Sequence, residues 1–295
     1  MRIFFYQFLI FLSKILGRWA FKLFAWFVAS GYFLFFPARV GNSLRFYQAL
    51  FPDRSRFYHL SCAWRQFHNF TDVFFDRFFL QEFDDLTYSS EGLEHLEQAL
   101  KDKNGAILLM SHVGNWEVAA HLLKKELQGT RLLLYMGVKH KEQIEGIQKE
   151  SLIQSGIHIV AVDEDGGSPM DIVEGIKFIE SGGVVSLAGD VIWKRNQRTI
   201  LVKFLGHEVC LPQTPHLFAL LSGAPMFIFF AFRTGENQYH FIMSPPISLV
   251  PASRNERDAA IRQSAQRYAD TLAAMVRNYP LQWYHFNSFL PSKPK

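Results

Sequence analysis

The sequence contains little cysteine. Cys62 and Cys210 are the only two among 295 residues, and they lie far apart without the short spacings of a zinc site. A disulfide framework needs more cysteines than this, so neither stabilising device is indicated. We therefore expect no metal, and a reducing compartment, such as the cytoplasmic side of a membrane, is the simpler prediction.

Several motifs are also absent. The chain has no G-x-S-x-G, H-E-x-x-H, G-x-x-x-x-G-K-[ST] or G-x-G-x-x-G pattern, which argues against the hydrolase, protease and nucleotide-binding classes that use them. Lysine and arginine are scattered without a polybasic block, so the net charge of +4 does not indicate nucleic acid as a partner. Anionic lipid head groups fit this charge equally well.

Aromatic residues are abundant, with 30 phenylalanines and an aromatic fraction of 16%. From Phe4 to Phe36 the chain is mostly apolar, and its only charged residues are Lys14, Arg18 and Lys22. As one helix this stretch would be about 50 Å long, more than the roughly 30 Å of a hydrocarbon core, so it must bend, tilt or lie in the interface. Its cations recur every four residues and share one side of a helix. We predict that residues 1–40 anchor the chain to a membrane, with one span from Trp19 to Phe36 as one arrangement and a buried helix pair as the alternative.

After mixed amphipathic patterns such as RFYQALF and SCAWRQFHNFTDVFFDRFFL, the pattern changes near Lys103. Short apolar runs now alternate with amphipathic stretches: AILLM then WEVAAHLLKKEL, RLLLYMGV then EQIEGIQKESLIQ, IHIVAV then SPMDIVEGIKFIE, and finally VVSLAG. This alternation is typical of strands joined by crossover helices in a parallel sheet that is covered on both faces.

A second block contains TILVKFLGHEV, a helical pattern in TPHLFALLSGA, and the apolar runs MFIFFAF and QYHFIMS on either side of a turn. The last helix is predicted to begin at Ser253, which has capping-box spacing to Glu256, and to end near Tyr279. The chain shows no internal repeat and no low-complexity linker. We therefore expect residues 41–295 to form one α/β domain with a mixed, largely parallel central sheet flanked by helices.

A histidine followed by an acid five positions later occurs four times, and the local pattern separates the four pairs. In helical stretches the two side chains diverge by about 140°, and in a strand an odd separation places them on opposite faces. Only His112 and Glu117 lie across a strand-to-helix turn, which Gly114 and Asn115 can form. We expect the carboxylate to orient the imidazole, so that the other ring nitrogen can take a proton from a hydroxyl.

The outer end of a parallel strand is where open α/β sheets place ligands, and the helix that follows offers N–H groups to a developing oxyanion. The alternative is a structural histidine at a strand-to-helix turn, with Glu117 merely favourable in the first turn of a helix. Spacing and local pattern leave both interpretations open.

The motif Ser-His-x-Gly-Asn-Trp-Glu at 111–117 resembles the catalytic motif of the late acyltransferases of lipid A biosynthesis in Gram-negative bacteria. These belong to the lysophospholipid and glycerol-phosphate acyltransferase superfamily. The resemblance extends over nearly the whole chain, through ALFPD (49–53), AGD (188–190), KFLGHEVCLPQTPHLFALLSGAP (203–225), Arg233 and YPLQW (279–283).

This resemblance implies transfer of a fatty acyl group from acyl carrier protein to a hydroxyl of a membrane glycolipid, without a cofactor, at the cytoplasmic face of the bacterial inner membrane. His112 would be the general base and Glu117 its orienting partner. The acidic carrier would be attracted to a basic rim around the cleft. Further candidates for substrate binding are Gly114, Asn115, Asp190, Arg198 in the cationic run WKRNQR (193–198), and Arg233. The alternative for Asp190 is a carboxylate that caps a helix or lies in a loop. The alternative for Arg198 and Arg233 is an arginine that only contacts solvent.

Two departures from the family remove positive charge. The family's basic His-Arg-Arg ending is replaced by YHFNSF (284–289), and the arginine expected before Gly156 is missing from KESLIQS. They favour a less anionic acceptor, such as another envelope glycolipid or a polyene-type lipid. Two other functions stay open: a lipid esterase or thioesterase in which His112 activates water, and a lipid-binding protein that has lost its chemistry.

Overall fold

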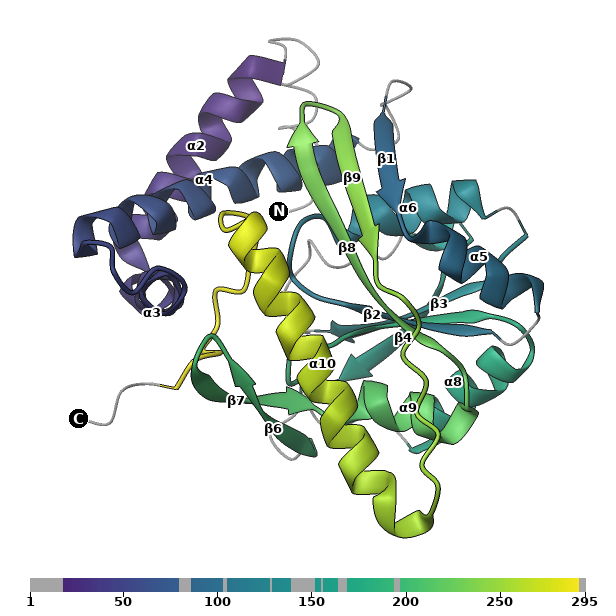
Figure 1. Ribbon diagram of the computed structural model, residues 1–295. Coiled ribbons are helices and arrows are strands. Elements are labelled where there is room, and N and C mark those ends of the chain that lie inside the picture. Colours follow the sequence, from purple (N-terminus) through teal and green to yellow (C-terminus); the bar gives the residue numbers. More distant parts are fainter. Residues whose placement is uncertain are drawn as a thin grey trace.

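The computed structural model describes residues 18–79, 86–102, 105–127, 129–138, 152–154, 156–163, 169–193 and 197–291 (Figure 1). Its centre is a seven-stranded sheet in the order β1-β9-β8-β2-β5-β3-β4. The strands β8, β2, β5, β3 and β4 run parallel to one another, whereas β9 is antiparallel to β8 and β1 is parallel to β9. The predicted fold class, α/β with a mixed, largely parallel central sheet flanked by helices, is confirmed.

The strands coincide with the apolar runs of the sequence because a strand covered on both faces needs apolar side chains at nearly every position. Their bounds are β1 Thr87–Glu91, β2 Ala106–Met110, β3 Leu132–Val138, β4 His158–Asp163, β5 Val184–Ala188, β8 Met226–Gly235 and β9 Gln238–Met243. The sequence did not predict β1. Its residues TYSSE are polar and mostly exposed, as suits a short strand at the edge of a sheet.

Successive residues of each central strand belong to two separate apolar cores, one on each face of the sheet. In β2, Ile107 and Leu109 pack into the core beneath α8 (Pro169–Glu180), α9 (Thr214–Ser222) and α10 (Arg257–Asn278). Leu108 and Met110 pack into the opposite core beneath α5 (Leu93–Lys101) and α6 (Trp116–Glu126). Both cores therefore fix β2, which is followed at its carboxyl end by the motif at 111–117.

An antiparallel hairpin of β6 (Thr199–Phe204) and β7 (His207–Pro212) packs beside α10 (Figure 1). Leu205 and Gly206 form its two-residue loop, both with positive φ, the geometry that suits a tight hairpin. The last helix is also as predicted, except that it opens with a 3-10 turn at Arg254–Glu256 and Ser253 contacts the Glu256 side chain. Most of the helix expected over 142–154 lies outside the described residues.

Three helices precede the sheet: α2 (Arg18–Phe35), α3 (Pro37–Leu50) and α4 (Arg56–Phe79). Aromatic contacts join α2 to α4, for example Trp26 with Trp64 at 6.0 Å between ring centroids. The predicted boundary between residues 40 and 41 falls inside α3, and the division into two domains remains a prediction. The part of the apolar stretch before Arg18, including Lys14, lies outside the described residues.

Within the described ranges, no helix alone has both the length and the apolar character to cross a membrane. Phe21–Phe35 and Pro37–Leu50 satisfy both criteria together, but they meet at an angle of 89°. Proline at the first position of α3 and the non-helical backbone of Phe36 account for this bend. Large apolar side chains remain exposed at this bend, among them Leu34 at 70% and Phe35 at 79%, and Phe57 at the start of α4 is 81% exposed.

Candidate active site

The site lies at the carboxyl ends of two neighbouring strands. β2 and β5 pair in parallel with Met110 opposite Ala188, so the residues that follow each strand also lie side by side. His112 stands two residues beyond β2, and Asp190 stands two residues beyond β5. Residues that are 78 positions apart are thereby brought into contact at the edge where parallel sheets place ligands.

Asp190 holds His112 through both carboxylate oxygens. Nδ1 of the imidazole lies 2.9 Å from Oδ1, and the backbone N–H of His112 donates to Oδ2 over 2.8 Å. The indole N–H of Trp283 also donates to Oδ2, over 3.0 Å. These contacts fix the ring in one plane and place a proton on Nδ1, which leaves Nε2 as the basic nitrogen.

Asp190 is ionised at neutral pH. Burial raises the pKa of its carboxyl, but the charge of His112 and the hydrogen bonds from His112 and Trp283 outweigh burial and bring the pKa to about 2. The folded pKa is thus below the ordinary value of 3.8. The resulting contribution to stability is present above about pH 4 and is lost as the pH falls toward 2.

Gly114 makes the turn after His112, as the sequence predicted. Its φ is +73°, and a Cβ there would lie 1.9 Å from the carbonyl oxygen of Ala231 in β8. The backbone N–H of Gly114 donates to the Gln282 carbonyl over 2.7 Å, and that of Asn115 donates to Ala231 over 2.8 Å. The backbone N–H groups of these two turn residues are therefore used within the protein. The N–H groups that we expected to serve an oxyanion belong to the helix that follows, and that role stays a prediction.

Glu117 does not accept from Nδ1 of His112. We expected these two residues to meet, but the carboxylate on Nδ1 is that of Asp190, because strand pairing rather than the local turn decides the partner. Glu117 lies in the first turn of α6, where 1% of it is exposed. Whether Glu117 contributes to the reaction stays a prediction.

Asn115 is fully buried and has the contacts of a helix cap. Its Oδ1 accepts from the backbone N–H of Val118 over 3.4 Å, and its Nδ2 donates to the hydroxyl of Tyr239 over 3.0 Å. The amide thus joins the start of α6 to β9. It is not among the residues that line the cavity, so the structure gives no support to its predicted contact with substrate.

A cavity of about 340 Å³ opens onto His112, whose side chain is 32% exposed. Most of its wall is apolar, with rings from α4, from the residues after β5 and from the segment after Trp283. The lining includes Phe70, Phe74, Trp116, Tyr135, Trp193, Tyr284 and Phe286. A mostly apolar lining with a few polar groups is typical of small-molecule binding sites.

Two further residues near His112 come from the segment after α10. Trp283 forms an isolated bridge with Val113 besides its bond to Asp190, and the His285 ring lies 5.8 Å from the His112 ring. Burial lowers the pKa of His285, so this histidine is neutral and adds no second positive charge beside His112. The sequence motif YPLQW contained Trp283, but nothing in its spacing indicated a contact with Asp190.

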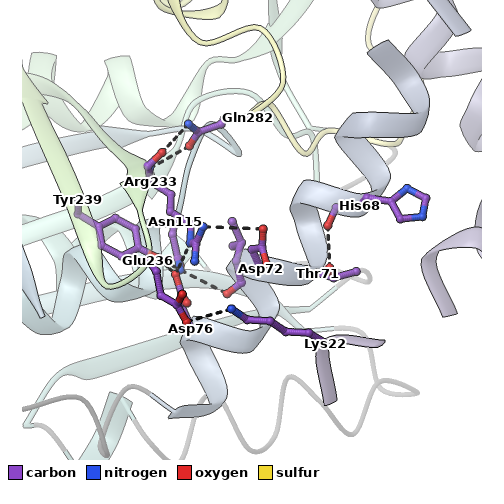
Figure 2. A network of polar contacts seen from close by, with 11 residues as sticks. Lys22, His68, Thr71, Asp72, Asp76, Asn115, Arg233, Glu236, Tyr239 and Gln282 are labelled. Atoms are coloured by element: carbon purple, nitrogen blue, oxygen red, sulfur yellow. Dashed lines mark hydrogen bonds and ion pairs between the residues drawn. The ribbon is translucent and has the colours of Figure 1, made fainter. Parts of the chain in front are cut away.

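Arg233 belongs to a second network of polar contacts, which joins α4 to β8 and β9 (Figure 2). Its Nε donates to the buried Asp76 of α4 over 2.7 Å, and Asp72 lies 3.7 Å from the guanidinium. Burial lowers the pKa of Arg233, but Asp76 and Asp72 outweigh it and raise the pKa. Arg233 was expected to bind substrate, yet its charge is neutralised inside the protein and it is not among the residues lining the cavity.

The network continues to the catalytic motif. Tyr239 donates to the same Asp76 oxygen over 2.5 Å and accepts from Asn115, while the Gln282 side chain donates to and accepts from the backbone of Arg233 over 2.9 Å (Figure 2). One buried cluster therefore connects α4, β8 and β9 to the start of α6 and the segment after α10.

Arg198 is exposed just before β6 and is not among the described residues that line the cavity. Two of the three cations in its run, Lys194 and Arg195, lie outside the described residues. Substrate binding by Arg198 therefore remains a prediction.

The fold and the site together define an α/β protein that presents a histidine–aspartate pair in an apolar cavity. The sequence profile of the bacterial lipid A biosynthesis acyltransferases matches residues 2–290. The chain belongs to this family, and its activity is that of an acyltransferase in lipid A biosynthesis. A comparison with curated proteins found no match.

Proposed function

We propose that this protein transfers a fatty acyl group from acyl carrier protein to a hydroxyl of an envelope glycolipid of the lipid A type, with His112 as the general base. The observation that carries the proposal is the contact of His112 with the ionised Asp190 at the mouth of an apolar cavity. Membership of the acyltransferase family supports the reaction class.

In the proposed step, Nε2 of His112 takes the proton of the acceptor hydroxyl while the oxygen attacks the thioester carbonyl carbon of the donor. Asp190 stabilises the imidazolium that forms. When the carbon–sulfur bond breaks, the imidazolium returns the proton to the leaving thiolate, so the products are an ester and a free thiol. Among the described residues, no hydrogen bond occupies Nε2.

We also propose that the protein works at the cytoplasmic face of the inner membrane. The support is the exposed apolar surface at the bend between α2 and α3, which includes Phe35, and at the start of α4, which includes Phe57. Side chains of this size are rarely exposed together unless they contact lipid or another apolar partner.

His112→Ala tests the proposed base. We expect turnover with acyl carrier protein thioester and a lipid A-type acceptor to fall by roughly 10² to 10⁴, the range for a lost general base. His207→Ala, in the turn region of the β6–β7 hairpin, is the matched control and should retain full activity. Undiminished acyl transfer by His112→Ala would remove His112 from the mechanism. Thioester hydrolysis that does not depend on an acceptor would instead identify a thioesterase.

A further inference from the structure

Arg39 lines the same cavity as His112. It lies in the first turn of α3, whereas His112 follows the carboxyl end of β2, so different elements bring the two side chains to one cavity. Among the described residues that line this cavity, Arg39 is the only lysine, arginine, aspartate or glutamate. In the part of the chain that the structure describes, the cavity therefore combines a mostly apolar wall with one permanent positive charge.

This charge is not used inside the described part of the protein. No carboxylate pairs with the Arg39 guanidinium, and the contact that it makes is with the ring of Phe36, 5.9 Å from the ring centroid. A cation in the first turn of a helix also opposes the helix dipole, and α3 has no acidic residue there to offset it. Local helix stability therefore does not explain an arginine at this position.

The fold holds Arg39 in place relative to the site. One turn further along α3, the side-chain amide of Asn42 donates to the carbonyl of Phe286 over 2.9 Å. Tyr47, still further along the helix, donates to the carbonyl of Pro280 over 3.0 Å. The segment containing these two carbonyls also supplies Trp283 to Asp190, so α3 and the catalytic pair are tied to the same piece of chain.

We propose that Arg39 binds a phosphate group of a substrate at the rim of the catalytic cavity. The inference rests on the proposed function, because both substrates of that reaction carry phosphate: the head group of a lipid A-type acceptor, and the phosphopantetheine arm of the donor. A planar guanidinium donates two parallel hydrogen bonds to such a group, and the apolar wall strengthens the contact.

The test measures binding without turnover. Trp116 and Trp193 line the cavity, so their fluorescence reports occupancy. In full-length His112→Ala protein, four probes are titrated in mixed micelles: a lipid A-type glycolipid with and without its phosphates, and an acyl thioester of phosphopantetheine or of pantetheine. Adding Arg39→Ala should weaken binding of a phosphorylated probe by roughly ten- to a hundredfold and leave its phosphate-free partner unchanged.

Arg56→Ala is the matched control, because Arg56 is also an exposed arginine in the first turn of a helix but does not line the cavity. It should bind all four probes as the parent does, and Arg39→Lys should keep part of the phosphate-dependent affinity. A loss confined to the glycolipid pair identifies the acceptor as the source of the phosphate, and a loss confined to the thioester pair identifies the donor. If Arg39→Ala binds every probe as tightly as Arg56→Ala, the proposal is wrong.

The turnover assay tests His112 as the base and the binding assay tests Arg39 as the phosphate site, so either proposal can be refuted without the other. Full acyl transfer by His112→Ala together with phosphate-dependent binding through Arg39 would overturn the proposed mechanism and leave the phosphate site intact. A large loss of turnover in His112→Ala, with no effect of Arg39 on any probe, would do the opposite.

Discussion

The carboxylate of Asp190 decides which nitrogen of His112 is basic. An ionised carboxylate on Nδ1 accepts a hydrogen bond, so the proton resides on Nδ1 and the lone pair of Nε2 faces the cavity. Glu117 is nearer in the sequence, but its position on α6 does not give it this contact in the structure.

Asp190→Asn should therefore impair catalysis while preserving the size of the side chain. Its amide oxygen can accept from Trp283 and from the backbone of His112, but its NH₂ group then faces Nδ1 and moves the imidazole proton to Nε2. We expect turnover to fall by roughly 10² to 10⁴, with little change in the binding of a lipid A-type acceptor. Steady-state kinetics on the purified variant provide the measurement.

Glu117→Gln is the comparison for this experiment. If Asp190 is the orienting partner, the glutamine variant should retain more turnover than Asp190→Asn. The reverse order, with the larger loss in Glu117→Gln, would restore the partner that the sequence motif suggested.

The turn between β2 and α6 depends on a close approach between two backbones. Gly114 adopts a left-handed conformation and lies against the Ala231 carbonyl of β8, where no Cβ fits. The same turn carries His112 on one side and the first residues of α6 on the other. A shift of this backbone would separate the imidazole from Asp190.

Gly114→Ala should lower the free energy of unfolding by more than about 2 kcal/mol and abolish most activity, because it adds a steric clash to an unfavourable φ. Gly206→Ala is the control. Gly206 also has a positive φ, of +81°, but nothing lies within 4 Å of its missing Cβ, so its cost should be about 1 kcal/mol. Denaturant unfolding measures both losses. Equal losses in the free energy of unfolding would show that the unfavourable φ alone, and not the clash with Ala231, sets the cost at Gly114.

The elements that the sequence predicted well are those with strong local patterns. The runs AILLM, IHIVAV and VVSLAG became strands because burial on both faces requires unbroken apolar residues. TYSSE forms β1 only because β9 is beside it, and that long-range pairing leaves no local signal.

The site was predictable only in part for the same reason. The motif around His112 identified one half of the catalytic pair, whereas the other half depends on the register of β2 against β5. Had this register been known, it would have predicted that His112 and Asp190 lie side by side, because each follows the end of its strand by two residues. Arg39 had no pattern to reveal it: a single arginine after Phe36-Pro37 acquires meaning only when α3 packs beside the cavity. It supplies positive charge to a cavity that is otherwise lined mostly by apolar residues among those that the structure describes.

Considering the molecule as a whole, the network around Asp76 links helices before the sheet to strands at its edge and to the catalytic motif (Figure 2). Asp76 is 1% exposed, so its charge depends on the partners that Arg233 and Tyr239 provide. We interpret Arg233 as a structural residue that holds these parts together.

Arg233→Ala should lower the free energy of unfolding by roughly 3–5 kcal/mol, the range for a buried charge left without its partner. Lys22→Ala, which removes an exposed ion pair with Glu236, is the control and should cost less than about 1 kcal/mol. Chemical denaturation gives both values. A small stability loss in Arg233→Ala, together with weaker binding of the phosphorylated glycolipid, would show that Arg233 binds substrate, as the sequence analysis predicted.

The contact between Trp283 and Asp190 also has a consequence for biosynthesis. A ribosome makes residue 283 after every strand of the seven-stranded sheet, so a nascent chain can assemble the sheet while Asp190 still waits for its indole donor. An interrupted translation product would thus carry the His-x-Gly-Asn-Trp-Glu motif on a formed sheet with its catalytic carboxylate incompletely held. If Asp190 orients His112 as proposed, unfinished copies of the protein should be poor catalysts, because they lack the indole that donates to this carboxylate.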